Sequence, residues 1–263
     1  MVILIDTNIR NMIVNKIIIT ANTSWNIFNF RLDLINLLKK NEYDIFVISN
    51  NDKTTNKFNN TVEFINIDLK KRNLNIFLFI NNYIKIFINI YKIKPSIILT
   101  YTFKSLILFN FVSFFFPKIR IINNFTGLGS LFLNNYYKYK IIRILIYLSL
   151  IRSNDLIFQN IYDYNIFKKK SFLKNKKFYL IPSSGINLKK YKYIGINNTK
   201  KEKLNFIMIA RLIKDKGVIE YMDAAKEVKK IYPELKFILI GEYDHNNNEK
   251  IEKKVLEKNI INK

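Results

Sequence analysis

The stretch 205–244 constrains the fold more than any other part of the chain, because it reads strand, basic loop, helix, strand. Residues 206–210 form an apolar run of strand length, and 237–240 form a second. Between these runs, apolar residues recur at helical spacing from Val218 to Val228, with charged residues on the opposite face. A unit of this kind predicts a parallel β-sheet that is covered by helices.

The loop between the first of these strands and the helix is basic. It places Arg211, Lys214 and Lys216 ahead of a single glycine, Gly217. A helix N-terminus presents free N–H groups and the positive end of the helix dipole, so an anion is expected at this loop. Two fixed cations there would neutralise a diphosphate. Because Lys and Arg make up 44 of the 263 residues, an ordinary solvated loop is the alternative on composition alone.

Apolar runs of strand length alternate with helical segments through the preceding part of the chain as well. The expected strands are 17–20, 44–49, 62–67, 97–100, 120–123, 156–158 and 178–181. This alternation predicts an α/β fold in which a doubly wound, Rossmann-like sheet carries helices between most of its strands. The chain is 49% hydrophobic, which suffices for one sizeable core and the beginning of a second.

A change in composition marks the expected domain boundary. Residues 189–203 are polar, basic and without periodicity, which is typical of an inter-domain linker. We therefore expect an N-terminal domain over 1–188, with 1–15 as an extension ahead of its first strand, and a second Rossmann-like domain from 204. One βαβ unit with a further helix, expected at 249–258, cannot bury both faces of a sheet. The segment 204–263 is therefore expected to be an incomplete domain.

Composition excludes several kinds of site. Zero cysteines exclude a disulfide scaffold and a thiolate metal site, and one histidine, His245, excludes a cluster of histidine ligands. We expect no metal, and we expect His245 in a surface loop. The net charge of +24 fits nucleotide substrates, an anionic membrane surface, nucleic acid or a plain compositional bias. Basic residues are spread throughout and no nucleic-acid motif is present, so nucleic acid is not an expected partner.

Three segments are unusually apolar and aromatic, at 74–91, 105–116 and 141–151. None has the roughly 18 uninterrupted apolar residues that a spanning helix needs. Helices packed on a sheet are one interpretation, and contact with an anionic membrane surface is the other, because Phe and Tyr beside lysines suit that interface. The first 15 residues lack a basic n-region and a cleavage site, so no signal peptide is expected. The expected location is cytoplasmic, peripheral on the inner face of the plasma membrane.

The order of residues in several segments resembles one family. The string ARLIKDKGVIEYMDAAKEVKKIYPELKFILIGEYD at 210–244 resembles the first βαβ unit of the C-terminal domain in family 4 retaining glycosyltransferases of GT-B fold. In the N-terminal half, KIIITANTSWNIFNFRLDLINLLKKNEYDIFVIS at 16–49 resembles the opening units of the same family. So do TYTFKS at 100–105, NNFTGLGSLF at 123–132, FQNIYD at 158–163 and IPSSGINLKKY at 181–191.

The resemblance implies an activity. It implies transfer, with retention, of a hexose or N-acetylhexosamine from a nucleotide-sugar donor, expected to be UDP-linked, to a saccharide acceptor. The acceptor is a free or a lipid-linked saccharide, and the lipid-linked form is expected. In this family the residues that match Arg211 and Lys216 hold the donor diphosphate, and Gly217 and Gly241 would lie on the same donor side. No cofactor is implied. The alternatives are a non-catalytic, basic, membrane-associated remnant of such a transferase, and a nucleotide-sugar epimerase, against which the lack of an acid–base set argues.

The acceptor side is expected on the N-terminal domain. Its expected residues are Asn22, Trp25, Asn29, Arg31, Lys104, Thr126, Gly127 and Gly129. We interpret 22–31 as a loop at the carboxyl end of the first strand, where ligands bind in such folds. Trp25 would stack on a sugar face or, alternatively, pack with Phe30 against the sheet edge. The glycines at 127 and 129 would let the backbone approach a ligand closely, or would simply make a turn.

Overall fold

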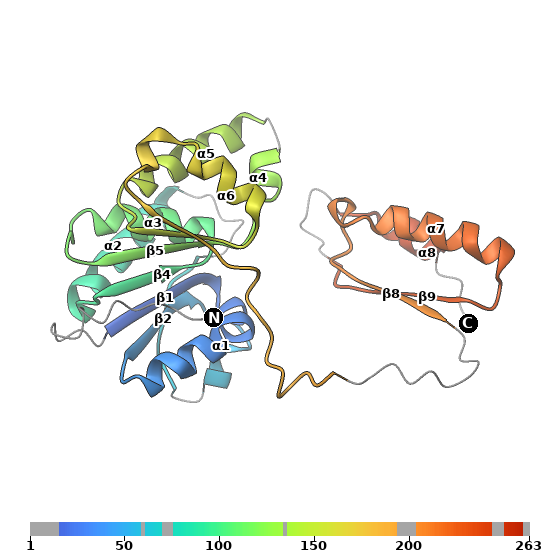
Figure 1. Ribbon diagram of the computed structural model, residues 1–263, viewed down its shortest axis with the longest axis horizontal. Helices are drawn as coiled ribbons and strands as arrows, with labels where there is room; N and C mark the ends of the chain where they lie inside the picture. The colour runs from blue at the N-terminus through green and yellow to red at the C-terminus, as the bar shows by residue number, and fades with distance from the viewer. Residues whose placement is uncertain are drawn as a thin grey trace. The chain divides into compact units, whose positions relative to one another are not determined.

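The computed structural model describes residues 16–58, 61–69, 76–133, 136–193, 204–243 and 250–259 (Figure 1). Their contacts divide the chain into two compact units, one that ends at Lys192 and one that begins at Tyr193. The expectations for 1–15, for most of the linker 189–203 and for His245 fall outside the described residues.

Unit 1 is built on one parallel sheet in the order β3-β2-β1-β4-β5-β6-β7. Its strands are β1 Lys16–Thr23, β2 Asp44–Asn50, β3 Glu63–Asn66, β4 Ile97–Thr100, β5 Arg120–Phe125, β6 Asp155–Phe158 and β7 Lys177–Leu180. Every pair of neighbouring strands is parallel. All seven expected strands are therefore confirmed, each within a few residues of its predicted ends.

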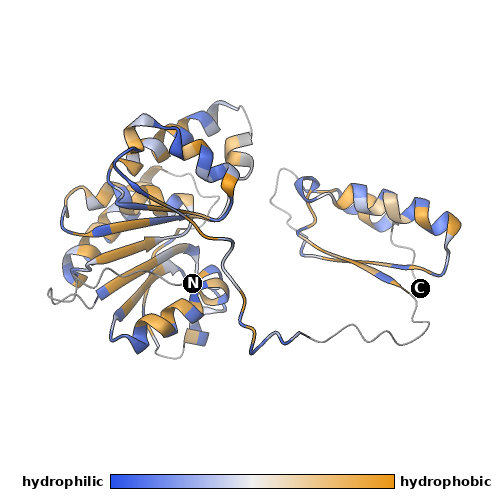
Figure 2. Ribbon diagram, in the orientation of Figure 1, coloured by the Kyte–Doolittle hydropathy of each residue, from blue (hydrophilic) through white to orange (hydrophobic). Residues whose placement is uncertain are grey.

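Helices cover both faces of this sheet, as a doubly wound fold requires. On one face lies α1 Ser24–Lys40, and on the other lie α2 Ile76–Ile93, α3 Phe103–Ser113, α5 Tyr137–Leu150 and α6 Ile161–Lys168. Shorter helical segments are η2 Thr55–Phe58, α4 Ser130–Leu133 and η3 Ser171–Leu173. Alternate strand residues face the two layers: Ile17 and Ile19 contact the α1 side, while Ile18 contacts the α2 and α3 side. Figure 2 shows the hydrophobic residues concentrated in these strands.

The strand order reverses between β1 and β4. The chain leaves β1 toward β2 through α1 and leaves β4 toward β5 through α3, on the opposite face. At such a reversal the connecting loops diverge, so the carboxyl ends of the two strands flank an opening where ligands bind in doubly wound folds. Two of the predicted acceptor-side segments, 22–31 and 100–105, therefore lie at this point.

The expectation that 22–31 is a loop is wrong. Asn22 and Thr23 are the last residues of β1, and Ser24 already begins α1. The transition needs no loop because Thr23 is extended and its Oγ1 accepts a hydrogen bond from the Asn26 N–H at 3.2 Å, which caps the helix. Trp25, Asn29 and Arg31 are consequently helical residues at fixed positions on α1.

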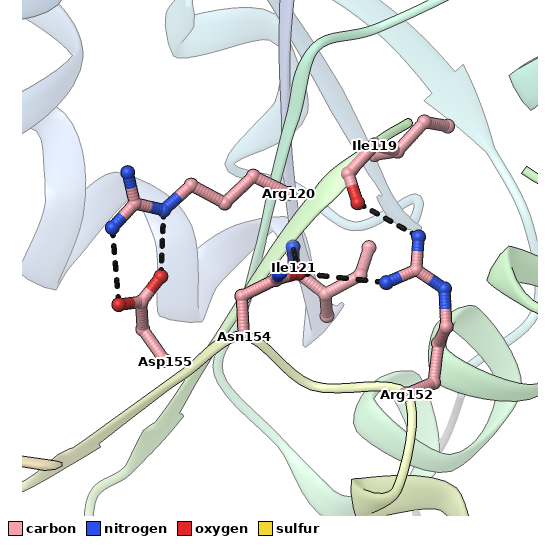
Figure 3. Close-up of polar contacts among 6 residues, drawn as sticks. All are labelled: Ile119, Arg120, Ile121, Arg152, Asn154 and Asp155. Carbon is pink, nitrogen blue, oxygen red and sulfur yellow. Dashed lines mark hydrogen bonds and ion pairs between the residues drawn. The ribbon is translucent and has the colours of Figure 1, made fainter. Parts of the chain in front are cut away.

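Polar contacts join the elements at the opposite end of the sheet, where the strands begin (Figure 3). Arg120 at the start of β5 forms a bidentate pair with Asp155 at the start of β6, with Nε–Oδ2 at 2.7 Å and Nη2–Oδ1 at 3.1 Å. Arg152 donates to the carbonyls of Ser113, Phe116 and Ile119 at 2.7–2.8 Å. These cations are held by the chain's own groups, so this end is structural.

Unit 2 is a βαβ unit with one further helix. It consists of β8 Asn205–Ile209, the short η4 Lys214–Lys216, α7 Val218–Ile231, β9 Lys236–Ile240 and α8 Lys253–Asn259. The two strands are parallel, as predicted. The predicted helix at 249–258 begins later, because Lys250 forms a β-bridge with Ile213 instead. One face of the sheet contacts a small core around Val218, Ile251 and Leu256.

The other face of the β8–β9 sheet is exposed. It carries the isoleucines Ile207, Ile209, Ile238 and Ile240. This agrees with the physical expectation that one βαβ unit and a helix cover a single face of their sheet.

Candidate functional site

The basic loop of unit 2 is held in shape by its backbone. After β8, the Ala210 N–H donates to the Ile240 carbonyl at 3.0 Å and the Leu212 N–H donates to the Glu242 carbonyl at 3.3 Å. The Gly217 N–H then donates to the Lys214 carbonyl at 3.0 Å, which closes η4. The loop therefore keeps its form without using any of its cationic side chains.

The cations of this loop are free to meet a ligand. Arg211, Lys214 and Lys216 are exposed, and no described residue forms an ion pair with any of them. Gly217 precedes α7 with φ 72°, the left-handed region that glycine occupies at little cost, and no side chain caps the helix. The N–H groups of the first turn of α7 are thus available to an anion, and the helix dipole favours one there.

Gly241 has a steric reason to be glycine. A Cβ at this position would lie 1.9 Å from the Ala210 carbonyl oxygen and 3.1 Å from Leu212 Cδ2. The glycine therefore permits the end of β9 to approach the segment that leads into the basic loop. This packing places Gly241 beside the predicted donor loop, and it accounts for the residue without any ligand.

The N-terminus of α1 in unit 1 differs from that of α7, because the chain supplies its own anion. The Asp52 carboxylate accepts hydrogen bonds from the Trp25 N–H at 2.9 Å and the Thr54 N–H at 2.8 Å. Burial alone would raise the pKa of Asp52, but the hydrogen bonds from Ser24, Trp25 and Thr54 hold it below its ordinary value. A ligand phosphate at this helix end would have to displace a carboxylate. Of these two helix ends, only that of α7 is open to an anion.

Arg31 is a buried cation at the point where the strand order reverses. It is 5% exposed, and its guanidinium carbon lies 4.1 Å from the ring centroid of Tyr101, the residue that follows β4. One Nη1 hydrogen bond goes to the Phe30 carbonyl at 3.0 Å, while Nε has no hydrogen-bond partner. Burial lowers the pKa of Arg31, and the Tyr101 contact opposes that shift. No described residue forms an ion pair with Arg31.

The remaining predicted residues of α1 and α3 lie around this point. Trp25 is 52% exposed and forms a T-shaped pair with Phe30, with ring centroids 5.6 Å apart, so about half of its surface is accessible to solvent or a ligand. Asn29 donates to the Trp25 carbonyl at 2.9 Å, which leaves its side-chain oxygen to accept from solvent or ligand. Lys104 lies in the first turn of α3, where burial lowers its pKa and the nearby Asp68 opposes that shift. Asn22 is partly exposed at the end of β1.

The glycine-containing turn after β5 is anchored at its centre. Leu128 is buried, and its N–H donates to the Asp163 carboxylate at 3.0 Å. Gly127 and Gly129, on either side, have φ values of 141° and 54°, and a Cβ on either would meet nothing within 4 Å. Thr126 and both glycines are exposed. The glycines are therefore required by backbone conformation, and they leave open space above the main chain.

Sequence reasoning missed three contributors to these sites. Asp52 closes the N-terminus of α1, Asp163 anchors the glycine turn, and Tyr101 supports Arg31. Asp163 also lies in the first turn of α6, whose N-cap is Asn160. None of these three contacts leaves a signal in the sequence, because each joins residues that are far apart in the chain. The Asn160 cap does leave a signal, because a cap is adjacent to its helix. The structure gives no contact that joins Trp25, Lys104 and the 126–129 turn to one another.

The family comparison identifies the class of protein. The family model described as "Glycosyl transferase 4-like" matches residues 16–160, which is more than half of the chain. The chain therefore belongs to the glycosyl transferase 4-like family, as the sequence resemblance implied.

One relative is the N,N'-diacetylbacillosaminyl-diphospho-undecaprenol alpha-1,3-N-acetylgalactosaminyltransferase of Campylobacter jejuni. It is 29% identical over 236 residues, which cover 84% of this chain and 61% of the relative. The chain thus spans less than two thirds of that protein.

Solved structures show the same fold. A sucrose-phosphate synthase from Thermosynechococcus elongatus matches with a TM-score of 0.69 at 14% identity, over 93% of this chain and 66% of that one. A UDP-GlcNAc 2-epimerase from Neisseria meningitidis matches with a TM-score of 0.57 at 15% identity, over 88% and 66%. At these identities the likeness shows the fold alone. The predicted α/β fold of GT-B type is confirmed.

Proposed function

We propose that the protein to which this chain belongs transfers a hexose or N-acetylhexosamine, with retention, from a UDP-linked donor to a lipid-linked saccharide. Family membership supports sugar transfer. The Campylobacter relative is named for a diphospho-undecaprenol acceptor and for transfer of an N-acetylgalactosaminyl group. That name supports the lipid-linked acceptor and the amino sugar in this proposal. Such an acceptor would place the reaction at the cytoplasmic face of the membrane.

The observation that carries the proposal is the contrast between two helix N-termini. At α7 the N-terminus has no side-chain cap and follows exposed, unpaired Arg211 and Lys216. At α1 the Asp52 carboxylate already occupies the corresponding position. Of these two helix ends, only the N-terminus of α7 is vacant, and it is also the one with cations beside it. A diphosphate group is therefore expected to bind there. We accordingly place the donor on unit 2 and the acceptor on unit 1.

The proposed role of the cations follows from the chemistry of the leaving group. As the glycosidic bond breaks, negative charge accumulates on the departing nucleoside diphosphate. Arg211 and Lys216, with the N–H groups of α7, would stabilise that charge more in the transition state than in the ground state. One such contact is worth about 3–4 kcal/mol by analogy with oxyanion-hole donors. In this proposal the cations act without a metal, and no described group of three or more acidic or histidine side chains suits one.

The acceptor side of the proposal rests on Arg31. A buried cation without a paired anion is costly, and an anionic group of the acceptor would relieve that cost. Trp25 presents accessible ring surface for stacking on a sugar, and the 126–129 turn presents accessible backbone. We propose that Arg31 contacts the phosphate of the acceptor and that Trp25 contacts its saccharide.

The experiment compares Arg211→Ala and Lys216→Ala with Lys226→Ala, an exposed lysine in the middle of α7 that pairs with Asp223. Calorimetry would measure binding of uridine diphosphate, and initial rates of sugar transfer would be measured in the full-length protein. We expect a loss in rate of about 100-fold or more for each loop variant and none for the control. Equal rates in all three variants would refute the role of the loop.

Further measurements separate the other parts of the proposal. Arg31→Lys is expected to raise the KM for the acceptor and to leave the affinity for uridine diphosphate unchanged. NMR of the first product formed would show the same anomeric configuration as the donor if transfer is retaining. If the protein binds vesicles but neither uridine diphosphate nor a nucleotide sugar, the alternative of a non-catalytic membrane-associated remnant replaces the proposal.

A further inference from the structure

Helix α2 is apolar on two opposite sides. One side contacts the sheet, where Ile86 and Ile90 are fully buried and Asn82 donates to the Asp68 carbonyl at 2.6 Å. The side chains of the other side are exposed and large. They are Ile76, Phe77, Ile80, Ile84, Ile88 and Tyr91, which we name the α2 stripe. At 3.6 residues per turn these six positions fall on one face of the helix, where a helix of a soluble protein ordinarily carries polar residues.

Helix α5 repeats this arrangement. The exposed apolar residues of α5 and of its C-cap follow the spacing i, i+4, i+7, i+11, i+14 and therefore lie on one face. They are Tyr137, Ile141, Ile144, Leu148 and Ile151, which we name the α5 stripe. Helix α3 contacts both α2 and α5, so the two helices belong to one layer on the same side of the sheet (Figure 1). The turn after α3 adds exposed Phe114 and Phe115, and Phe115 meets Phe87 of α2 edge-to-face with ring centroids 5.6 Å apart.

The segment that contains both stripes has no acidic residue. Between Asp68 and Asp155 the sequence carries thirteen basic side chains and no Asp or Glu. The basic residues are Lys70, Lys71, Arg72, Lys85, Lys92, Lys94, Lys104, Lys118, Arg120, Lys138, Lys140, Arg143 and Arg152. All 20 acidic residues of the chain lie outside this segment, so the excess of basic residues is locally complete here. Arg120 and Arg152 are held at the amino-terminal end of the sheet, whereas Lys85 and Lys92 are exposed beside the α2 stripe. An apolar surface flanked by basic residues is complementary to an anionic lipid interface.

We propose that the α2 and α5 stripes dock unit 1 onto an anionic bilayer, with α2 lying in the plane of the interface. The isoleucines and phenylalanines would enter the boundary between headgroups and acyl chains. Lys85 and Lys92, on the flank of the α2 stripe, would contact lipid phosphates. This inference deepens the proposed function, on which it rests for the lipid-linked acceptor.

Two other occupants of this surface fit less well. A second copy of the chain would place two surfaces flanked by basic residues against each other, which like-charge repulsion opposes. A spanning arrangement is suggested by length and composition, since α2 is the one helix in the described part of the chain that is long and apolar enough to cross a membrane. To span, however, α2 would have to withdraw Ile86 and Ile90 from the core.

The test measures co-sedimentation of the 263-residue chain with extruded vesicles, without any substrate. One set contains phosphatidylcholine alone, and the other contains 30 mol% phosphatidylglycerol in addition. We expect binding to the anionic set that weakens as salt rises. The double variant Ile80→Ser/Ile84→Ser should lower the partition coefficient by about tenfold or more, because two exposed isoleucines lose their insertion into lipid. Lys85→Glu/Lys92→Glu should weaken binding to the anionic vesicles alone.

The matched control is Ile161→Ser/Ile231→Ser. These isoleucines are also exposed and helical, but they lie on α6 and α7, outside the two stripes. The control should bind vesicles like the parent chain. If the parent chain does not bind anionic vesicles, or if the stripe and control variants bind equally, the proposal is overturned.

Sedimentation velocity without lipid provides a second refutation. A dimer of the parent chain that Ile80→Ser/Ile84→Ser dissociates would assign the stripes to a copy of this chain and reject the membrane. Because vesicle binding is measured without sugar transfer, its failure would leave the donor-site experiments on Arg211 and Lys216 unaffected. Their failure would likewise leave membrane docking standing.

Discussion

Replacement of Gly241 by alanine is the perturbation whose cost the structure defines best. The new Cβ would lie 1.9 Å from the Ala210 carbonyl oxygen, whereas a carbon and a carbonyl oxygen ordinarily approach to about 3.3 Å. The two segments must therefore separate by roughly 1.4 Å. Hydrogen bonds on either side of Gly241 oppose this, from Ala210 to Ile240 at 3.0 Å and from Leu212 to Glu242 at 3.3 Å.

The expected loss of stability follows from those contacts. Losing two backbone hydrogen bonds costs about 2 kcal/mol, and overpacking adds about 1–3 kcal/mol. The total of about 3–5 kcal/mol is a large share of the stability of a unit of roughly 70 residues, which is about 4–10 kcal/mol. Unit 2, one face of whose sheet is exposed, is expected at the lower end of that range.

Hydrogen exchange followed by mass spectrometry measures this loss within one chain. Amides of β8 and β9 should lose protection by about 100-fold in Gly241→Ala, while those of β1 and β4 in unit 1 stay unchanged. Gly129→Ala is the matched control, because its Cβ meets nothing within 4 Å and only the positive φ of 54° costs about 1–2 kcal/mol. Protection of β8 and β9 that changes less than about threefold in Gly241→Ala would refute the steric argument. Gly241 would then have to be explained by close approach of a ligand.

Two further predictions concern carboxylates of unit 1. Asp155→Asn should destabilise unit 1 by about 3 kcal/mol in urea denaturation, because it removes the carboxylate that pairs with Arg120. The control, Asp223→Asn on the exposed helix α7, should cost less than about 0.5 kcal/mol. Equal costs would show that the Arg120 pair is not structural. Asp52→Asn should cost about 1 kcal/mol at pH 7, as loss of a helix cap does. Because the folded-state pKa of Asp52 is lowered, the carboxylate stabilises the fold above its unfolded pKa of about 3.9, and that stabilisation is lost as pH falls through the lower folded value. Urea denaturation of parent and variant should therefore converge once the pH falls below the folded-state pKa of Asp52, and a difference that persists in strong acid would contradict the assignment.

Elements with a local cause could be predicted from the sequence. The parallel strands and the helix at 218–231 follow from periodicity, which is a property of neighbouring residues. The cap of α6 also has a local cause, because Asn160 accepts a 2.8 Å hydrogen bond from the N–H of Asp163, three residues further along. The start of α1 was missed because its cap, Thr23, lies at the end of a strand and no glycine or proline marks the boundary.

The candidate sites likewise divide into features with a local cause in the sequence and features that depend on distant residues. The donor loop 211–217 was recognised because its cations and its glycine are adjacent in the chain, and its donor role stays a prediction. The acceptor-side residues were chosen from their expected places after strands and from the family resemblance, and the structure joins only some of them to supporting groups. Arg31 and Tyr101 are 70 residues apart, and no pattern in the sequence indicates that their side chains meet at 4.1 Å.

The sequence by itself determined the order of strands and helices, the parallel sheet and the basic loop ahead of α7, because each depends on residues that are close in the chain. The tertiary structure alone decided which helix end is already occupied by a distant carboxylate of the chain. Asp52 reaches the Trp25 N–H because parallel pairing of β1 and β2 brings their carboxyl ends side by side. Within the described residues of unit 2, no side chain forms a cap hydrogen bond at the N-terminus of α7, and the Glu220 carboxylate lies in the helix's own first turn. Whether a helix end is occupied or vacant depends on which distant carboxylate the fold brings to it.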